Sequence, residues 1–130
     1  MQRLVTALLI VVATSASAFA QSLPVPSYWR SQRGSEMKIF TIDAQGIFKG
    51  IFVKHDGGLT CENTPFNLAG RAKGNRVQFI VVWINFAQNC NSQTFWHGHI
   101  AGKTINTRWV LYNNGKIPLS VSGTDIFQEE

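Results

Sequence analysis

Short segments with β-strand character follow one another through nearly the whole chain, and this regularity limits the possible folds more than any other feature. From Tyr28 onward, runs rich in Val, Ile, Thr, Phe and Trp alternate with turn residues such as Gly46, Gly74 and Gly102. No stretch shows the apolar period of a helix. The pattern therefore predicts an all-β domain. Its eight expected strands are residues 28–29, 37–42, 47–54, 66–73, 76–86, 93–101, 104–112 and 121–127.

Eight strands joined by short turns favour an up-and-down meander. An even-numbered meander can close into an antiparallel β-barrel, and closure removes the unpaired sheet edges that promote aggregation. We therefore expect an eight-stranded antiparallel up-and-down β-barrel, whose interior has room for one small ligand. A two-sheet sandwich is the alternative that the strand pattern leaves open.

The first twenty residues have the features of a secretory signal peptide. Arg3 gives the positive start, residues 4–13 are an apolar run, and residues 18–20 (Ala-Phe-Ala) form a small-residue cleavage motif before Gln21. The apolar run is shorter than the roughly 20 residues that span a bilayer, which argues against a membrane anchor. We expect residues 1–20 to be removed and the protein to be secreted or periplasmic.

Length and charge exclude several classes of protein. Of 130 residues, 110 remain after the leader, enough for a single domain over residues 21–130. Without Arg3, 11 basic residues face 7 acidic ones, so the net charge is +4. The basic residues are scattered rather than gathered in a tract, so we expect neither a nucleic-acid partner nor a membrane partner.

The two cysteines of the chain, Cys61 and Cys90, are expected to form a disulfide in an oxidising compartment. A metal pair is the alternative, but no further Cys or His lies at ligand spacing, so we expect no metal. In a meander, the loops after odd-numbered strands meet at one end of the barrel. Both cysteines fall in such loops, residues 55–63 and 87–92, so their bond would join two loops at that mouth. We expect the functional site there.

Three tryptophans, Trp83, Trp96 and Trp109, lie in strand-like runs beside hydroxyl or amide residues. Because side chains alternate along a strand, Thr94 shares a face with Trp96, and Thr107 shares a face with Trp109. Aromatic walls with a few polar groups suit a small organic ligand. The same residues would also suit a barrel filled by its own side chains, so composition alone leaves both interpretations open.

Five sequence blocks resemble the avidin/streptavidin family in both order and spacing: residues 28–35, 66–70, 92–98, 105–109 and 123–127. The segments 61–65 and 89–92 are most similar to the dimeric bacterial avidins, which have a disulfide at the matching positions. The resemblance implies an avidin-like barrel that binds biotin without catalysis and needs no other cofactor.

The resemblance also implies a role for particular side chains. The three tryptophans would surround the fused rings of biotin, and Thr94 would contact the ring sulfur. Asp125 would accept a hydrogen bond from a ureido N–H, and Ser35 would donate one to the ureido oxygen. Ser92 would help to hold the carboxylate.

Three positions depart from the family pattern. Ser31 replaces an Asn and Phe52 replaces a Tyr, both of which donate to the ureido oxygen in relatives; Lys54 replaces a residue that accepts from the second ureido N–H. An ammonium group cannot accept a hydrogen bond. Residues 113–122 contain no Trp to close a neighbouring subunit's site as in tetrameric relatives, so a homodimer is expected.

Two other functions deserve comparison with biotin binding. An avidin-like barrel with Phe52 and Lys54 would suit a different small ligand, anionic or more apolar. A hydrolase would need His97 or His99 beside Ser92 and Asp125, but strand alternation places both histidines on the opposite face from Thr94 and Trp96. We therefore do not expect an enzyme.

Overall fold

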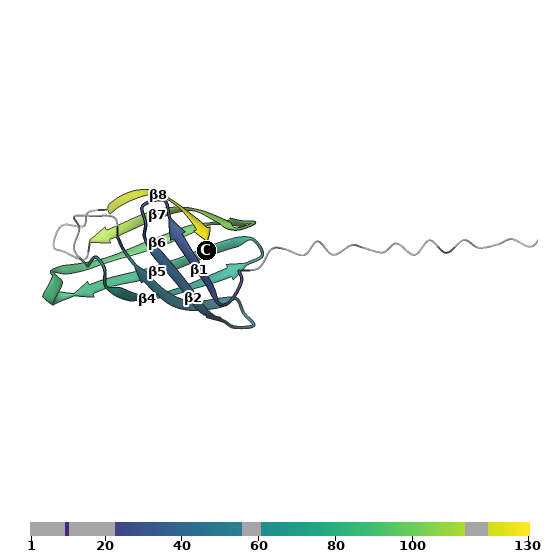
Figure 1. Cartoon of the computed structure of the whole chain (residues 1–130), viewed down its shortest axis with the longest axis horizontal. Coiled ribbons are helices and arrows are strands. Elements are labelled where there is room, and N and C mark those ends of the chain that lie inside the picture. The colour runs from purple at the N-terminus through teal and green to yellow at the C-terminus, as the bar shows by residue number, and fades with distance from the viewer. Residues whose placement is uncertain (1–9, 11–22, 56–60, 114–119) are drawn as a thin grey trace, which may run out of the picture.

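The chain forms a closed antiparallel barrel in a computed structural model, which describes Ile10 and residues 23–55, 61–113 and 120–130. Consecutive strands pair with each other, and the last strand pairs with the first (Figure 1). The expected barrel is confirmed, and the sandwich alternative is wrong. The strands are β1 (Ser27–Ser31), β2 (Glu36–Ile42), β3 (Ile47–Val53), β4 (Pro65–Lys73), β5 (Arg76–Asn85), β6 (Cys90–Ala101), β7 (Thr104–Asn113) and β8 (Ser120–Glu129).

Alternating side chains explain why these segments build a barrel with a packed interior. Along β5, Val77, Phe79, Val81 and Trp83 are buried while the residues between them are exposed. The inward residues of all strands meet in one apolar core, because each strand presents every second side chain to the interior. The largest fully buried side chains include Trp29, Phe48, Phe79, Phe127 and Met37.

Several strands are longer than expected, and β1, β6 and β8 each gain three residues. β6 begins at Cys90 rather than at residue 93, because its ladder with β5 continues to the pair Asn85 and Cys90. A short 3-10 helix, η1 (Phe86–Gln88), makes the turn where a plain loop was expected. The side-chain oxygen of Asn85 accepts the N–H of Gln88 at 3.3 Å, which satisfies a helix-end donor that strand patterns do not reveal.

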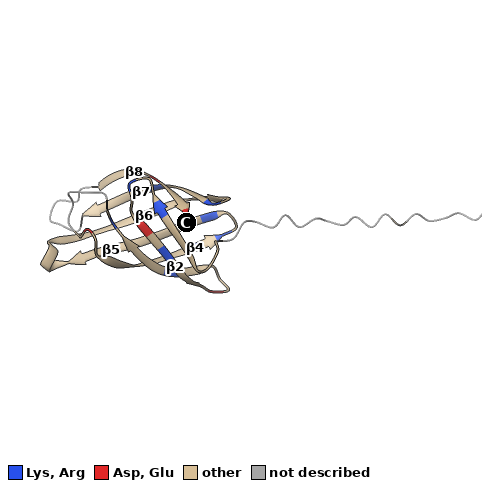
Figure 2. Cartoon of the chain, in the orientation of Figure 1, with Lys and Arg blue, Asp and Glu red and all other residues tan. Residues whose placement is uncertain are grey.

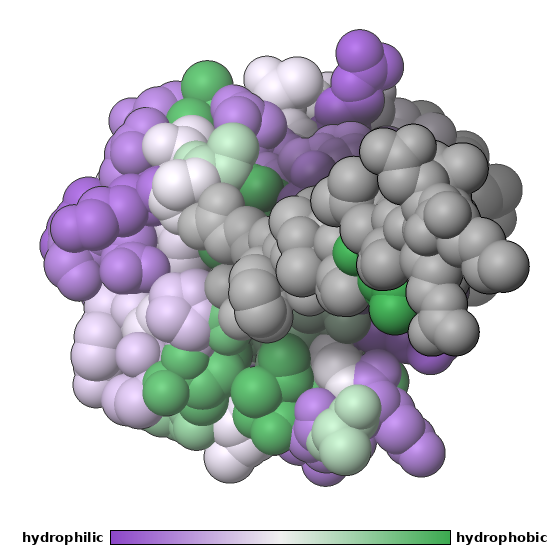
Figure 3. Space-filling view, turned by 90° about the vertical axis from the view of Figure 1, so that its right-hand side faces the viewer, coloured by the Kyte–Doolittle hydropathy of each residue, from purple (hydrophilic) through white to green (hydrophobic). Residues whose placement is uncertain are grey.

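The two ends of the barrel are different. The β5–β6 hairpin with η1 lies at the left-hand end of Figure 1, and β8 runs from that side toward the C-terminus. Lys and Arg lie mainly in the half away from η1 (Figure 2). Figure 3 looks onto this second end, where hydrophilic residues lie on the left of the view and hydrophobic residues gather toward its lower edge. We call the end with η1 the mouth.

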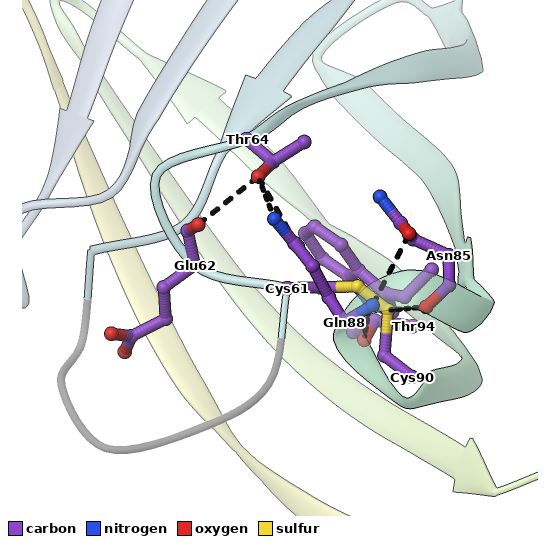
Figure 4. The surroundings of a disulfide bond; sticks show 8 residues. Cys61, Glu62, Thr64, Asn85, Gln88, Cys90 and Thr94 are labelled. Carbon is purple, nitrogen blue, oxygen red and sulfur yellow. Dashed lines mark hydrogen bonds between the residues drawn. A yellow bond between two sulfur atoms is a disulfide. The ribbon is translucent and has the colours of Figure 1, made fainter.

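A disulfide joins two segments at the mouth, as expected from the topology. Cys61 and Cys90 are bonded with their Cα atoms 6.0 Å apart (Figure 4). Hydrogen bonds support the same corner: Gln88 Nε2 donates to Thr64 Oγ1 at 3.0 Å. The link closes a loop of 29 residues and thereby anchors the start of β6 to the chain that enters β4.

The expected signal peptide, residues 1–20, lies outside the described residues apart from Ile10. In the part of the chain that the structure describes, no helix has the length and apolar character needed to cross a membrane.

Candidate functional site

A cavity of about 100 Å³ opens at the mouth, and we call it the inner cavity. Its lining comes from the inward faces of β3 and β5 to β8 and from the chain just beyond β1 and β3. Eight of the ten expected ligand-binding residues lie here. The lining is Arg33, Ser35, Phe52, Lys54, Trp83, Thr94, Trp96, Trp109, Leu111 and Asp125.

A wider outer cavity of about 380 Å³ continues from the inner one toward the disulfide. The two share Lys54, Trp83, Trp109 and Leu111. Ser92, the ninth expected residue, lines this outer part. The site is therefore a narrow inner space with a broader entrance, and Ser92 stands at the entrance.

Aromatic rings pack closely around the inner end. The ring of Phe52 lies with its centroid 4.9 Å from that of Trp96 and 5.6 Å from that of Trp83. Phe79 stacks on Trp96, with centroids 4.9 Å apart and planes at 16°. The surrounding rings therefore hold the indole groups of Trp83 and Trp96 in place.

Two hydrogen bonds orient the buried indole groups. The Trp83 N–H donates to Thr94 Oγ1 at 2.8 Å, and the Trp96 N–H donates to Asp125 Oδ2 at 2.9 Å. A hydroxyl that accepts one hydrogen bond can still donate its own hydrogen. Thr94 therefore offers the cavity an O–H donor, whereas Asp125 offers a carboxylate acceptor.

The third indole, Trp109, fits because of its neighbour across the β7–β8 ladder. Gly123 pairs with Trp109, and a Cβ at Gly123 would lie 2.8 Å from Trp109 Cε2. Any larger residue would push the ring from its place. The Trp109 indole nitrogen is buried and has no hydrogen-bond partner among the described residues.

Two serines flank the turn between β1 and β2, and their hydroxyl groups make different contacts. The Ser35 hydroxyl oxygen accepts the N–H of His55 at 3.2 Å and lines the inner cavity, so its O–H can point to a ligand. Ser31, the tenth expected residue, is also buried, but its hydroxyl accepts the N–H of Ser35 at 3.1 Å. Ser31 shapes the turn and does not line either cavity.

Arg33 is a site residue that the sequence pattern did not indicate. It lies in the same turn, and its guanidinium forms an ion pair with Asp125 Oδ1. The guanidinium carbon is 5.2 Å from the centroid of the Trp109 ring, within the range of a cation–π contact. Its position between Ser31 and Ser35 was the available signal. Leu111 was also missed, although it has the same strand parity as Trp109 and Thr107.

The cavity lining carries more positive than negative charge. Lys54 Nζ lies 5.8 Å from the centroid of the Trp83 ring, so a second cation flanks the entrance. The charged lining residues of the inner cavity are Arg33, Lys54 and Asp125. The site thus has two cations and one carboxylate, an arrangement that attracts an anionic group.

The two histidines of β6 do not approach this site. His97 and His99 are exposed, while the residues that alternate with them, Trp96 and Ile100, are buried. No described group of three or more His, Cys, Asp or Glu residues is placed to hold a metal ion.

A closed eight-stranded barrel with a tryptophan-walled cavity at one end places the chain in a recognisable structural class. The model of the avidin family matches residues 19–129. The chain belongs to the avidin family.

Individual relatives agree with this assignment. Afifavidin of Afifella pfennigii is 38% identical over 117 residues, which cover 85% of this chain and 73% of that protein. The bradavidin2–biotin complex has a TM-score of 0.74 and 37% identity, and the match covers 83% of this chain and 99% of bradavidin2. For the rhizavidin–biotin complex these values are 0.75 and 36%, with coverage of 82% and 92%.

Proposed function

We propose that this protein binds biotin, without catalysis, in the cavity at the mouth of the barrel. One observation carries the proposal: three tryptophans and three polar groups of the kinds that a cyclic urea needs line a single inner cavity. Two relatives of more than 35% identity have been solved as biotin complexes, which supports the same ligand here.

Each part of biotin finds a suitable partner under this proposal. The indole groups supply flat apolar walls for the fused rings. The Asp125 carboxylate accepts a ureido N–H, Ser35 donates to the ureido oxygen, and Thr94 donates to the ring sulfur. The carboxylate of biotin reaches the outer cavity, where Ser92 and the ammonium of Lys54 lie.

The affinity is lower than a full set of partners would give. Phe52 offers no hydrogen-bond donor to the ureido oxygen, and Lys54 no acceptor to the second ureido N–H. Each missing partner costs roughly 1–3 kcal/mol, so two weaken binding by about 10²–10⁴-fold. The proposed dissociation constant is nanomolar to micromolar.

Isothermal titration of the oxidised protein, residues 21–130, with biotin tests the function. We expect saturable binding with one biotin per barrel and a rise in melting temperature, because a ligand that binds only the folded state stabilises it. Pentanoic acid, which lacks the fused rings, is the control and should give neither effect. Absence of heat and of a thermal shift at millimolar biotin would reject the proposal.

A second candidate keeps the fold and changes the ligand. The two cations of the lining, Arg33 and Lys54, together with the apolar Phe52, favour a small anionic or more apolar molecule. The double variant Phe52→Tyr with Lys54→Ser separates this candidate from biotin.

We also propose that the protein acts after export, as a secreted or periplasmic protein, and as a homodimer. The leader-like residues 1–20 support export. Support for the dimer comes from β5, where Ile80, Val82 and Ile84 form an outward apolar row with exposures of 36%, 44% and 46%. A second copy would remove such a row from water.

Light scattering of the mature protein is expected to give twice the monomer mass. Val82→Glu should shift that mass toward the monomer, because a charge in an apolar interface loses its hydration. Gln78→Glu, an exposed position of the same strand outside the apolar row, is the matched control. A monomer mass for the unmodified protein at micromolar concentration would contradict the dimer.

A further inference from the structure

We infer that the Arg33 side chain occupies part of the ligand site. Its guanidinium pairs with Asp125 and packs on Trp109, where the planar, N–H-bearing head group of a ligand would bind. A ligand therefore has to displace Arg33. The inference rests on the proposed function for the choice of biotin as ligand. The contact itself does not depend on that choice.

The Asp125 carboxylate is one of the two groups that Arg33 contacts in the site. Its Oδ2 accepts the Trp96 N–H at 2.9 Å, and its Oδ1 accepts from Arg33 Nη2. Both carboxylate oxygens therefore have a donor within the chain. The Asp125 side chain is only 7% exposed, so an oxygen that lost its donor would be poorly hydrated.

The Arg33 guanidinium resembles a cyclic urea in shape and in its N–H donors. It is flat, it donates N–H groups in its own plane, and it lies 5.2 Å from the centroid of the Trp109 ring. A cyclic urea shares these properties: it is planar, it donates N–H groups, and it packs on aromatic walls. Arg33 thus contacts Asp125 and Trp109, the two residues that the ureido group of biotin would contact.

The inner cavity is narrow, and Arg33 is exposed enough to move out of it. The inner cavity measures about 100 Å³ against about 380 Å³ for the outer cavity, and Arg33 lines only the inner one. The Arg33 side chain is 39% exposed and begins in a surface turn, so it can leave toward solvent and enlarge the space.

Displacement determines which ligands are accepted. A ligand that removes Arg33 must return an N–H donor to Asp125, because the buried oxygen is otherwise left without a partner. Head groups with planar N–H donors meet this condition: cyclic ureas, guanidines and amidines. Arg33 is therefore a specificity-determining residue, since it discriminates against ligands that offer only apolar surface.

The test compares Arg33→Ala with Arg30→Ala. Arg30 is matched in side chain and in charge, but it lies on the outer surface, paired with Glu36 at 3.0 Å and Glu130 at 2.5 Å. We expect Arg33→Ala to bind biotin about 10- to 100-fold more tightly than the unmodified protein, because the ligand no longer breaks an ion pair and a cation–π contact. Arg30→Ala should stay within about twofold, since exposed ion pairs are weak.

A second arm needs no biotin. Methylguanidinium and 2-imidazolidinone should bind Arg33→Ala in the millimolar range and shift the NMR signal of the Trp96 indole N–H, whereas the unmodified protein should show no such shift. If Arg33→Ala does not fold, Arg33→Met, which has no N–H donor in its side chain, replaces it in both arms.

The two arms separate this inference from the proposed function. If biotin binds neither the unmodified protein nor Arg33→Ala, biotin binding is rejected. The methylguanidinium measurement alone then decides whether Arg33 occupies the site. Binding of either small probe to the Arg33 variant alone supports the inference. No probe binding, or biotin affinity in the variant equal to or below that of the unmodified protein, overturns it.

Discussion

The double variant Phe52→Tyr with Lys54→Ser is expected to bind biotin about 10²–10⁴-fold more tightly than the unmodified protein. Both residues line the inner cavity. The tyrosine adds an O–H donor for the ureido oxygen, and the serine adds an acceptor for the second ureido N–H. Each change supplies a partner that the ligand otherwise lacks. Competition titration against a weaker ligand measures the difference.

A matched control uses the same chemical changes outside the cavity. Lys49→Ser lies on the exposed face of β3, and Phe66→Tyr alters a ring that packs on Trp83, with centroids 5.1 Å apart, without lining either cavity. This pair should leave the affinity unchanged. Equal biotin affinity in the Phe52→Tyr, Lys54→Ser variant and the unmodified protein would show that neither position determines the ligand, and it would remove the second candidate function as well.

Loss of the disulfide is expected to lower the free energy of unfolding by roughly 3–4 kcal/mol. The link between Cys61 and Cys90 spans 29 residues, so its removal restores considerable freedom to the unfolded chain. Both cysteines are buried, and Cys61→Ala with Cys90→Ala avoids placing a new polar group there. Urea denaturation of the oxidised protein and of the double variant gives the two free energies.

Reduced, unmodified protein is the control for this measurement, because it lacks the cross-link but keeps both sulfur atoms. It should unfold at nearly the same urea concentration as the double alanine variant. Only the effect of the two Cys→Ala replacements separates the two midpoints. A difference below about 1 kcal/mol between oxidised and reduced protein would contradict the chain-entropy explanation.

Strand alternation predicted the fold well because a closed barrel depends on few other signals. The inward placement of Phe79, Val81 and Trp83 follows from a period of two, and the structure confirms that all three are buried. The pairing of Cys61 with Cys90 followed from the presence of two cysteines in an expected oxidising compartment, and the meander placed both of them at the same end of the barrel. Turn details were harder: η1 depends on the Asn85 side chain, a local contact that competes with continued strand pairing.

Most of the candidate site was predicted, and the two lining residues that were missed are Arg33, in a turn, and Leu111, in β7. Alternation places Thr94, Trp96 and Trp109 on the inner face, and each lines the inner cavity. Ser31 is the last residue of β1 and is buried as alternation predicts, whereas Arg33 lies in the β1–β2 turn, where no period determines the direction of a side chain. The turn geometry directs the Ser31 hydroxyl to the Ser35 N–H and leaves the longer Arg33 side chain to reach Asp125.

The meeting of the first and last strands has a practical consequence for the use of this barrel. The Glu130 N–H donates to the Tyr28 carbonyl at 2.9 Å, and Trp29 pairs with Glu129, so the last residue is beside the first strand. The Trp-lined entrance is at the opposite pole. A reporter protein attached after Glu130 would leave ligand entry unobstructed, and a short peptide joining Glu130 to Ser27 would turn the domain into a covalent ring.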